Sequence, residues 1–198
     1  MGKRIAVSGG IGAGKSTVIK LIKDEGYSVF SCDEIYKEIL LDKEYVKIIN
    51  ETFEGVVKNG EIDKRALANI VFNDDFARET LDALSHPRIM SRLLDKMGNC
   101  EEDLVFAEVP LLFEGGYENL FDGIIVVIRN QEERIHAVEQ RDKAAKADVL
   151  ARMATQFDYE AKENQNKLNA PNVCIIKNED TLDNLKSKLL KCLNFFKN

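Results

Sequence analysis

The sequence has no apolar segment approaching the ~20 residues that a membrane-spanning helix requires. Ile5-Ala6-Val7 runs directly into glycines and lacks the apolar core of a secretory signal, so we expect a cytoplasmic protein without a membrane partner. Positive charge is also scarce, because 28 Lys and Arg stand against 34 Asp and Glu, a formal net charge of −6. Nucleic-acid binding depends on neutralising phosphates, so this balance argues against a nucleic-acid partner.

Cysteine is sparse and irregularly spaced. The chain has four cysteines, none of them in a C-x-x-C pair: Cys32, Cys100, Cys174 and Cys192. This spacing argues against a zinc site and against a disulfide framework. We therefore predict reduced, partly buried thiols, as is usual for cytosolic proteins.

Short apolar segments alternate with amphipathic helical patterns along the 198 residues. Five of these segments read as strands, at 4–8, 27–31, 104–109, 123–128 and 173–176. The alternation predicts one α/β domain, in which helices flank a five-stranded parallel sheet. Residues 34–97 are mostly helical and too long for a single crossover, so we expect part of them to form a separate lobe. Helices are also predicted at 131–142, at 147–157 and from about Thr181 onwards.

The segment Gly9-x-x-x-x-Gly14-Lys15-Ser16 matches the pattern of a phosphate-binding P-loop. An apolar strand precedes it and a helical pattern follows it, and this context argues against a chance glycine-rich turn. The glycines let successive N–H groups converge on phosphate, and the helix adds its positive N-terminal end. Lys15 would reach the β- and γ-phosphates, and the Ser16 hydroxyl would ligate Mg²⁺. The motif leaves open whether the chain is a GTPase, an ATPase or a small-molecule kinase.

Charged residues near the ends of the other strands are candidates for the remaining chemistry. Asp33 follows the second strand, where it can be a general base or the N-cap of a helix, and its position does not decide between them. Glu108 lies where a Walker-B carboxylate would sit, a position from which it could order the second shell of Mg²⁺. Arg134, Arg141 and Arg152 follow the fourth strand, as lid residues over the γ-phosphate or as solvated surface residues.

Several segments together resemble the dephospho-CoA kinase family, over about residues 4–178. They occur in the family's order and are the loop 9–17, Asp33, Asp63-x-Arg65-x-Leu67 with Val71-Phe72, Leu84-x-His86-Pro87, the segment 109–114, Gln140-Arg141-Asp142 and Gln156. The His-Pro pair and the Pro-Leu-Leu-Phe-Glu segment are far more specific than the P-loop.

The resemblance implies a P-loop kinase fold with a helical, CoA-binding lobe at 34–97 and a mobile lid at about 131–157. It implies transfer of the ATP γ-phosphate to the ribose 3′-hydroxyl of dephospho-CoA with Mg²⁺, by a monomer or weak homo-oligomer. Asp33 would be the general base, and Lys15 and Arg141 would hold the transferring phosphoryl. The residues expected to bind ATP are Gly10, Gly12, Ala13, Gly14, Lys15, Ser16, Thr17, Arg141 and Asn178. Those expected to bind the acceptor are Asp33, Lys37, Arg65, His86, Pro110, Leu111, Leu112 and Phe113.

The chain departs from the family pattern after the second strand. Ser31-Cys32-Asp33 keeps only the last acid of the usual Asp-Ala-Asp, and Tyr36-Lys37 replaces the usual Ala-Arg. Lysine keeps the charge but loses the bidentate fork, so acceptor binding near Lys37 can differ.

Two alternatives stay open beside this family. One is another small-acceptor P-loop kinase, for a nucleotide or nucleoside, and the other is a nucleotide-dependent switch. A GTPase would need an Asn-Lys-x-Asp segment, whereas Asn166-Lys167 is followed by Leu168-Asn169.

Overall fold

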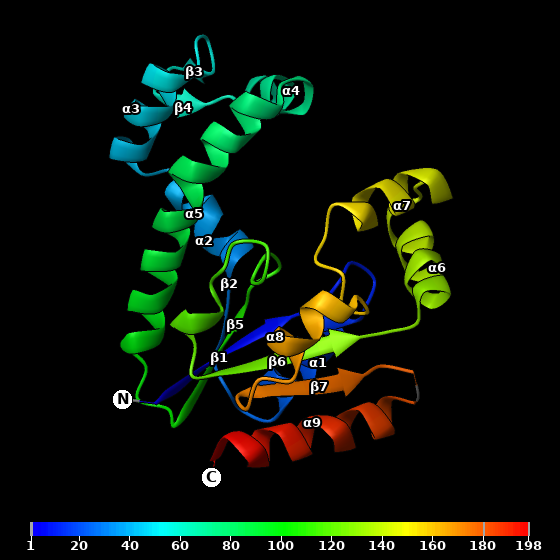
Figure 1. Cartoon of the computed structure of the whole chain (residues 1–198). Coiled ribbons are helices and arrows are strands. Elements are labelled where there is room, and N and C mark those ends of the chain that lie inside the picture. Colours follow the sequence, from blue (N-terminus) through cyan, green and yellow to red (C-terminus); the bar gives the residue numbers. More distant parts are fainter. Residues whose placement is uncertain (1, 180, 198) are drawn as a thin grey trace. The chain divides into compact units, whose positions relative to one another are not determined.

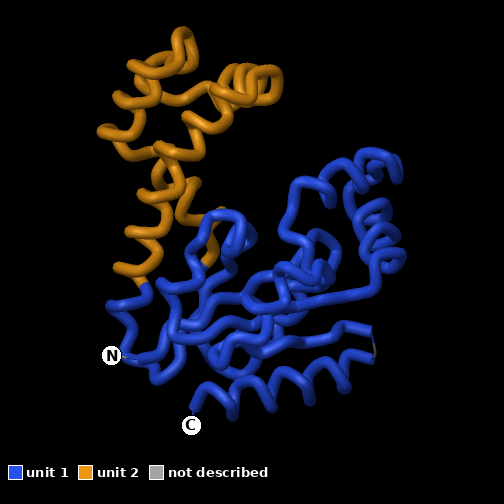
Figure 2. The backbone as a smooth tube through the Cα atoms, in the orientation of Figure 1, with its two compact units in different colours: residues 1–30, 97–198 blue, residues 31–96 orange. Residues whose placement is uncertain are grey.

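The computed structural model describes residues 2–179 and 181–197, which divide into two compact units (Figure 2). Residues 1–30 and 97–198 belong to the first unit, and the second unit is the continuous segment Ser31–Lys96.

The first unit is built on a five-stranded sheet (Figure 1). The strand order is β2 (Val29–Ser31), β5 (Leu104–Glu108), β1 (Lys3–Ser8), β6 (Gly123–Ile128) and β7 (Val173–Lys177). β1 pairs in parallel with β5 and with β6, and β6 pairs in parallel with β7. The predicted parallel sheet is confirmed. β2 is shorter than the predicted strand at 27–31, because the N–H group of Ser28 donates to the Glu102 carboxylate at 2.8 Å.

Helices α1 (Lys15–Asp24) and α9 (Leu182–Lys197) pack against each other on one face of this sheet. Together with β1, β5, β6 and β7 they form the main apolar core. Leu182 and Leu190 of α9 lie outside this core and are 58% and 37% exposed. The buried stripe of α9 instead consists of Leu185, Leu189, Cys192, Leu193 and Phe196, and the helical period places the other two leucines outside it.

The other elements of the first unit lie after β5, after β6 and before β7. They are η1 (Glu118–Leu120), α6 (Gln131–Asp142), α7 (Lys146–Ala154), η2 (Lys162–Asn164) and α8 (Gln165–Leu168). α6 has the predicted bounds, but α7 ends at Ala154 and not at residue 157. The helix stops because the N–H group of Phe157 donates to the Glu114 carboxylate and not to a carbonyl of the preceding turn.

The second unit is mostly helical, as expected for this segment. It contains α2 (Cys32–Ile39), α3 (Lys43–Thr52), the hairpin of β3 (Val57–Lys58) and β4 (Glu61–Ile62), α4 (Lys64–Asn73) and most of α5 (Asp75–Gly98). Asn59-Gly60 forms the hairpin turn with positive φ at both residues, and Asp63 caps α4.

Pro87 lies inside the continuous helix α5, a position that proline usually disfavours. Proline cannot donate to the carbonyl four residues earlier, which belongs to Ala83. Pro87 and Ala83 are both exposed, so water can satisfy that carbonyl.

Among the described residues, no helix is long and apolar enough to cross a membrane.

The prediction that all four cysteines are reduced thiols is wrong, because Cys174 of β7 and Cys192 of α9 form a disulfide. The two cysteines are 18 residues apart in the sequence, and their Cα atoms lie 5.9 Å apart in the fold. Spacing along the chain did not predict the pair, because the packing of α9 against β7 brings the two side chains together.

We expect the disulfide to stabilise the fold by roughly 3 kcal/mol, since it closes a loop of this length in the unfolded chain. The Cys174→Ala/Cys192→Ala variant should therefore melt at a lower temperature than the oxidised protein in a calorimetric scan. Alkylation of the denatured protein should label two cysteines without reductant and four with it. Four labelled cysteines without reductant would contradict the pairing.

Candidate active site

The loop between β1 and α1 has the backbone that a phosphate cradle needs. Gly9, Gly12 and Gly14 have φ values of +148°, +75° and +96°, a region that side chains other than glycine rarely adopt. Gly14 is the N-cap of α1, and no side chain caps the helix there. The first N–H groups of α1 therefore stay available for an anion, and the helix dipole favours negative charge at this end.

The same glycines are tightly enclosed by other elements. A Cβ atom on Gly12 would lie 2.5 Å from the carbonyl oxygen of Arg134, and one on Gly14 would lie 2.2 Å from Nδ2 of Asn178. At Gly10 the nearest atom would be a guanidinium nitrogen of Arg134, at 2.2 Å. The loop is thus packed against α6 and the end of β7 with no room for side chains.

Lys15, the first residue of α1, folds back over this loop. Its Nζ donates to the carbonyl of Gly9 at 2.6 Å and to that of Gly10 at 3.1 Å. Burial lowers the pKa of Lys15, and the nearby charge of Glu108 opposes this shift. Arg134 and Arg141 lower the pKa further. These charges place Glu108, Arg134 and Arg141 in the electrostatic surroundings of Lys15, as expected for a phosphoryl-transfer site.

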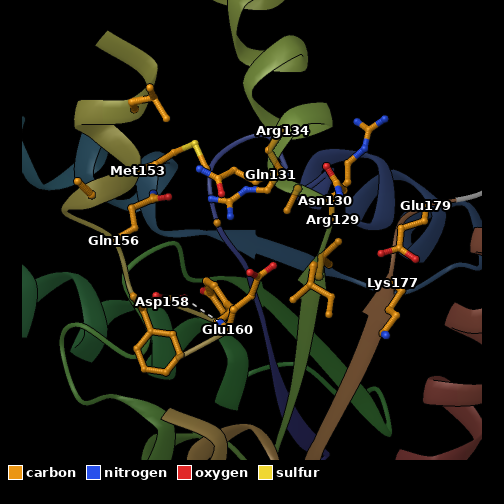
Figure 3. Close-up of a pocket in the computed structure, with 18 residues that line it drawn as sticks. Arg129, Asn130, Gln131, Arg134, Met153, Gln156, Asp158, Glu160, Lys177 and Glu179 are labelled. Carbon is orange, nitrogen blue, oxygen red and sulfur yellow. Dashed lines mark hydrogen bonds between the residues drawn. The ribbon is translucent and has the colours of Figure 1, made fainter. Parts of the chain in front are cut away.

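A cavity of about 600 Å³ lies beside the loop (Figure 3). Its lining includes Gly10 and Ala13, together with polar residues that follow β6 and surround the end of β7: Arg129, Asn130, Gln131, Lys177 and Glu179. In parallel α/β sheets ligands bind at the carboxyl ends of strands. We did not predict Arg129, Lys177 or Glu179 as site residues, although their places at strand ends were a usable signal.

Asn178 connects the end of β7 to the phosphate loop. Its Nδ2 donates to the carbonyl of Ala13 at 2.9 Å, and its N–H group donates to the carbonyl of Ile128 at 2.9 Å. Ser16 lies exposed in the first turn of α1, and Thr17 follows it. The structure thus brings the predicted ATP-binding residues of the loop together with Asn178.

The three arginines after β6 have different surroundings. Arg134 is half-buried, and its Nε donates to the carbonyl of Ile11 at 2.9 Å. Arg141 is exposed and forms a bidentate pair with Asp142, with distances of 2.7 and 3.0 Å. Arg152 reaches the same carboxylate at 3.0 Å. The hydrogen bonds from Arg141 lower the pKa of Asp142, and the arginine's own pKa is raised by the same contact.

Four of the predicted acceptor residues belong to the second unit, Ser31–Lys96: Asp33, Lys37, Arg65 and His86. Asp33 lies exposed in the first turn of α2, and Ser31 is the N-cap, so Asp33 does not take the alternative role of cap. Lys37 and Arg65 are exposed, and Nε2 of His86 lies 3.5 Å from the Asp82 carboxylate.

The predicted apolar rim after β5 is only partly available. Leu111 is 43% exposed and Pro110 is half-buried, but Leu112 and Phe113 are 0% and 4% exposed. The ring of Phe113 stacks on that of Phe157 at a centroid distance of 4.5 Å, so packing occupies it. Pro110 and Leu111 are the part of this segment that can contact a ligand.

Comparison with known proteins gives a consistent result. The family model for dephospho-CoA kinase matches residues 3–183. The dephospho-CoA kinase of Thermus thermophilus is 37% identical over 158 residues, which cover 80% of this chain and 77% of the relative. That of Fusobacterium nucleatum is 30% identical over 187 residues, with 93% and 94% covered.

Solved structures agree with this match. The protein TT1252 of Thermus thermophilus superposes with a TM-score of 0.81 at 33% identity, covering 98% of this chain and 96% of that chain. Dephospho-CoA kinase from Campylobacter jejuni gives a TM-score of 0.69 at 30% identity, with the same coverage. The phosphate loop, the parallel sheet and these matches establish that the chain is an ATP-dependent kinase that belongs to the dephospho-CoA kinase family.

Proposed function

We propose that this chain transfers the γ-phosphoryl group of ATP to the ribose 3′-hydroxyl of dephospho-CoA. The observation that carries the proposal is the enclosed phosphate loop with Lys15 folded over it, in a chain of the dephospho-CoA kinase family. The proposal requires neither a nucleic-acid nor a membrane partner.

On the donor side, the proposed phosphate ligands are Nζ of Lys15 and those N–H groups of the loop and the start of α1 that are not bonded within the protein. The N–H group of Ile11 is not among them, because it donates to Gln156. Lys15 would exchange its bonds to the carbonyls of Gly9 and Gly10 for phosphate oxygens. The Ser16 hydroxyl is exposed at the start of α1 and would ligate Mg²⁺, which supplies charge neutralisation at the phosphates when bound. The cavity beside Asn178 would hold the base and ribose of ATP.

Arg141 is proposed to close over the transferring phosphoryl. In the structure its guanidinium pairs with Asp142, and both groups are accessible to water. Exposed ion pairs contribute ~0–1 kcal/mol, so exchanging Asp142 for a phosphate costs little. A guanidinium that reaches the phosphoryl group stabilises the charge that develops in the transition state.

On the acceptor side, Asp33 is proposed as the general base that accepts the 3′-hydroxyl proton. Its exposed carboxylate, not engaged as the cap of α2, suits that role. Lys37, Arg65 and His86 are proposed to bind the rest of dephospho-CoA, with the charged side chains meeting its phosphates. Pro110 and Leu111 would provide apolar contact, while Leu112 and Phe113 would support them from the core.

The choice of acceptor is tested by measuring ADP release with dephospho-CoA, AMP and adenosine in parallel, each at the same concentration. We expect turnover with dephospho-CoA well above that with the other two. Turnover with AMP or adenosine alone would show that the chain is a kinase of another small acceptor.

The glycine geometry predicts a sharp contrast between two alanine substitutions at similar φ. Gly12→Ala should weaken ATP binding at least tenfold, because its Cβ would lie 2.5 Å from a backbone oxygen of α6. Gly55 has a φ of +73° against +75° for Gly12, but nothing lies within 4 Å of its Cβ position. Gly55→Ala should therefore leave ATP binding within twofold of the wild type in titration calorimetry. Equal affinity for both variants would contradict the packed cradle.

Asp33→Asn tests the proposed base. The variant should bind ATP as the wild type does but lose roughly 10²–10⁴ in turnover with dephospho-CoA, the usual contribution of a positioned base. Steady-state kinetics measure the loss, and Glu34→Gln is a control on the next exposed residue of α2. Wild-type turnover in Asp33→Asn would remove Asp33 from this role.

A further inference from the structure

Residues 156–159, which follow α7, contact three separate parts of the first unit. Gln156 reaches the phosphate loop, Phe157 reaches the segment after β5, and Tyr159 reaches the end of β1. The proposed ATP roles above use none of these contacts. We call residues 156–159 the strap.

The first contact holds Ile11 in the phosphate loop. Oε1 of Gln156 accepts the N–H group of Ile11 at 2.8 Å, while Nε of Arg134 donates to the carbonyl of Ile11 at 2.9 Å. Gln156 and Arg134 also line the same cavity (Figure 3). Both polar groups of one glycine-flanked residue are therefore fixed by side chains from elsewhere, in a loop that glycines would otherwise leave flexible.

The second contact attaches the strap to the segment 110–114. The ring of Phe157 stacks on Phe113 at 4.5 Å, and its N–H group donates to the Glu114 carboxylate at 2.8 Å. Nζ of Lys167 lies 5.9 Å from the centres of both rings, which adds cation–π attraction to the stack. The acceptor-side residues Pro110 and Leu111 directly precede this anchored part of the chain.

The third contact is made by Tyr159, and local hydrogen bonds also hold the backbone of the strap. Tyr159 is buried, and its hydroxyl lies 3.5 Å from Oγ of Ser8, the last residue of β1 before the phosphate loop. The N–H group of Gln156 donates to the carbonyl of Met153 near the end of α7. The carboxylate of Asp158 accepts hydrogen bonds from the N–H groups of Glu160 and Ala161. Four consecutive residues without regular structure are thus held at each position.

We propose that the strap couples the phosphate loop to the segment 110–114, with Gln156 and Phe157 as positioning residues for phosphoryl transfer. Gln156 fixes the backbone of Ile11 in the phosphate loop, and Phe157 links this position to the segment 110–114. The role of the segment 110–114 in this inference rests on the proposed function. The expected effect of the strap on ATP binding does not depend on which acceptor is used.

The test measures the affinity for a non-hydrolysable ATP analogue without acceptor. Gln156→Met keeps the length of the side chain but removes the acceptor for Ile11, and it should weaken binding about fivefold, the value of one hydrogen bond. Phe157→Leu leaves Gln156 and the loop residues in place, yet it should weaken binding at least threefold, because the strap loses its anchor. The double variant should bind no more than about twofold weaker than the weaker single variant, because the two residues act through one element.

Two matched controls separate this effect from a loss of stability. Thr155→Val removes a hydroxyl that donates to the carbonyl of Arg152 within its own helix end, next to Gln156. Phe195→Leu removes a ring contact with Phe196 on α9. Both controls should keep analogue affinity within twofold of the wild type, and circular dichroism checks that each variant is folded. Phe157→Met replaces Phe157→Leu if the latter does not fold.

Steady-state kinetics provide a second readout. Both strap variants should raise KM for ATP and also lower kcat with dephospho-CoA, whereas a role in stability alone leaves both constants of the folded fraction unchanged. Wild-type analogue affinity in the folded Phe157 variant, or fully additive effects in the double variant, would overturn the coupling. If all variants bind the analogue as the wild type does, and the wild-type protein itself does not turn over dephospho-CoA, both the coupling and the proposed acceptor are overturned. Weakened affinities without such turnover would support the coupling and refute the acceptor alone.

Discussion

The donor site depends on one constraint, which is that a glycine-rich loop keeps one backbone conformation beside the N-terminus of α1, where no side chain caps the helix. Glycines permit this backbone but do not enforce it, since they also allow many others. The restraint comes from side chains outside the loop: Arg134 and Gln156 hold Ile11, and Asn178 holds Ala13. The geometry of the phosphate site is therefore a property of α6 and of the residues that follow α7 and β7 as much as of the loop sequence.

Electrostatics act on the same place. Burial disfavours the charged form of Lys15, and the carbonyls of Gly9 and Gly10 compensate by accepting its hydrogen bonds. Arg134 and Arg141 add positive charge nearby, which Glu108 opposes. A polyphosphate supplies the negative charge that such a cluster favours, so the cations are already gathered where the ligand's charge is needed. Lys15 and Arg134 therefore need not be assembled at each turnover, whereas Arg141 has to exchange Asp142 for the phosphoryl group.

The sequence predicted features whose signals are local and missed features that depend on tertiary packing. The P-loop pattern and the apolar strands each lie within a few residues, and the structure has both. The bond from Gln156 to Ile11 spans 145 positions, and the disulfide needs α9 to lie against β7. Leu111 and Leu112 read alike in an apolar segment, yet only the fold decides that the first is exposed.

The proposed reaction transfers the γ-phosphoryl group of ATP to the 3′-hydroxyl of dephospho-CoA. Phosphorus NMR of the purified product tests it most directly, because a phosphate monoester on the ribose gives a resonance separate from the pyrophosphate bridge. The account predicts one new monoester signal coupled to the ribose 3′-proton, formed in equal amount to ADP. ADP formed with inorganic phosphate and no monoester, or a monoester at another hydroxyl, would contradict it.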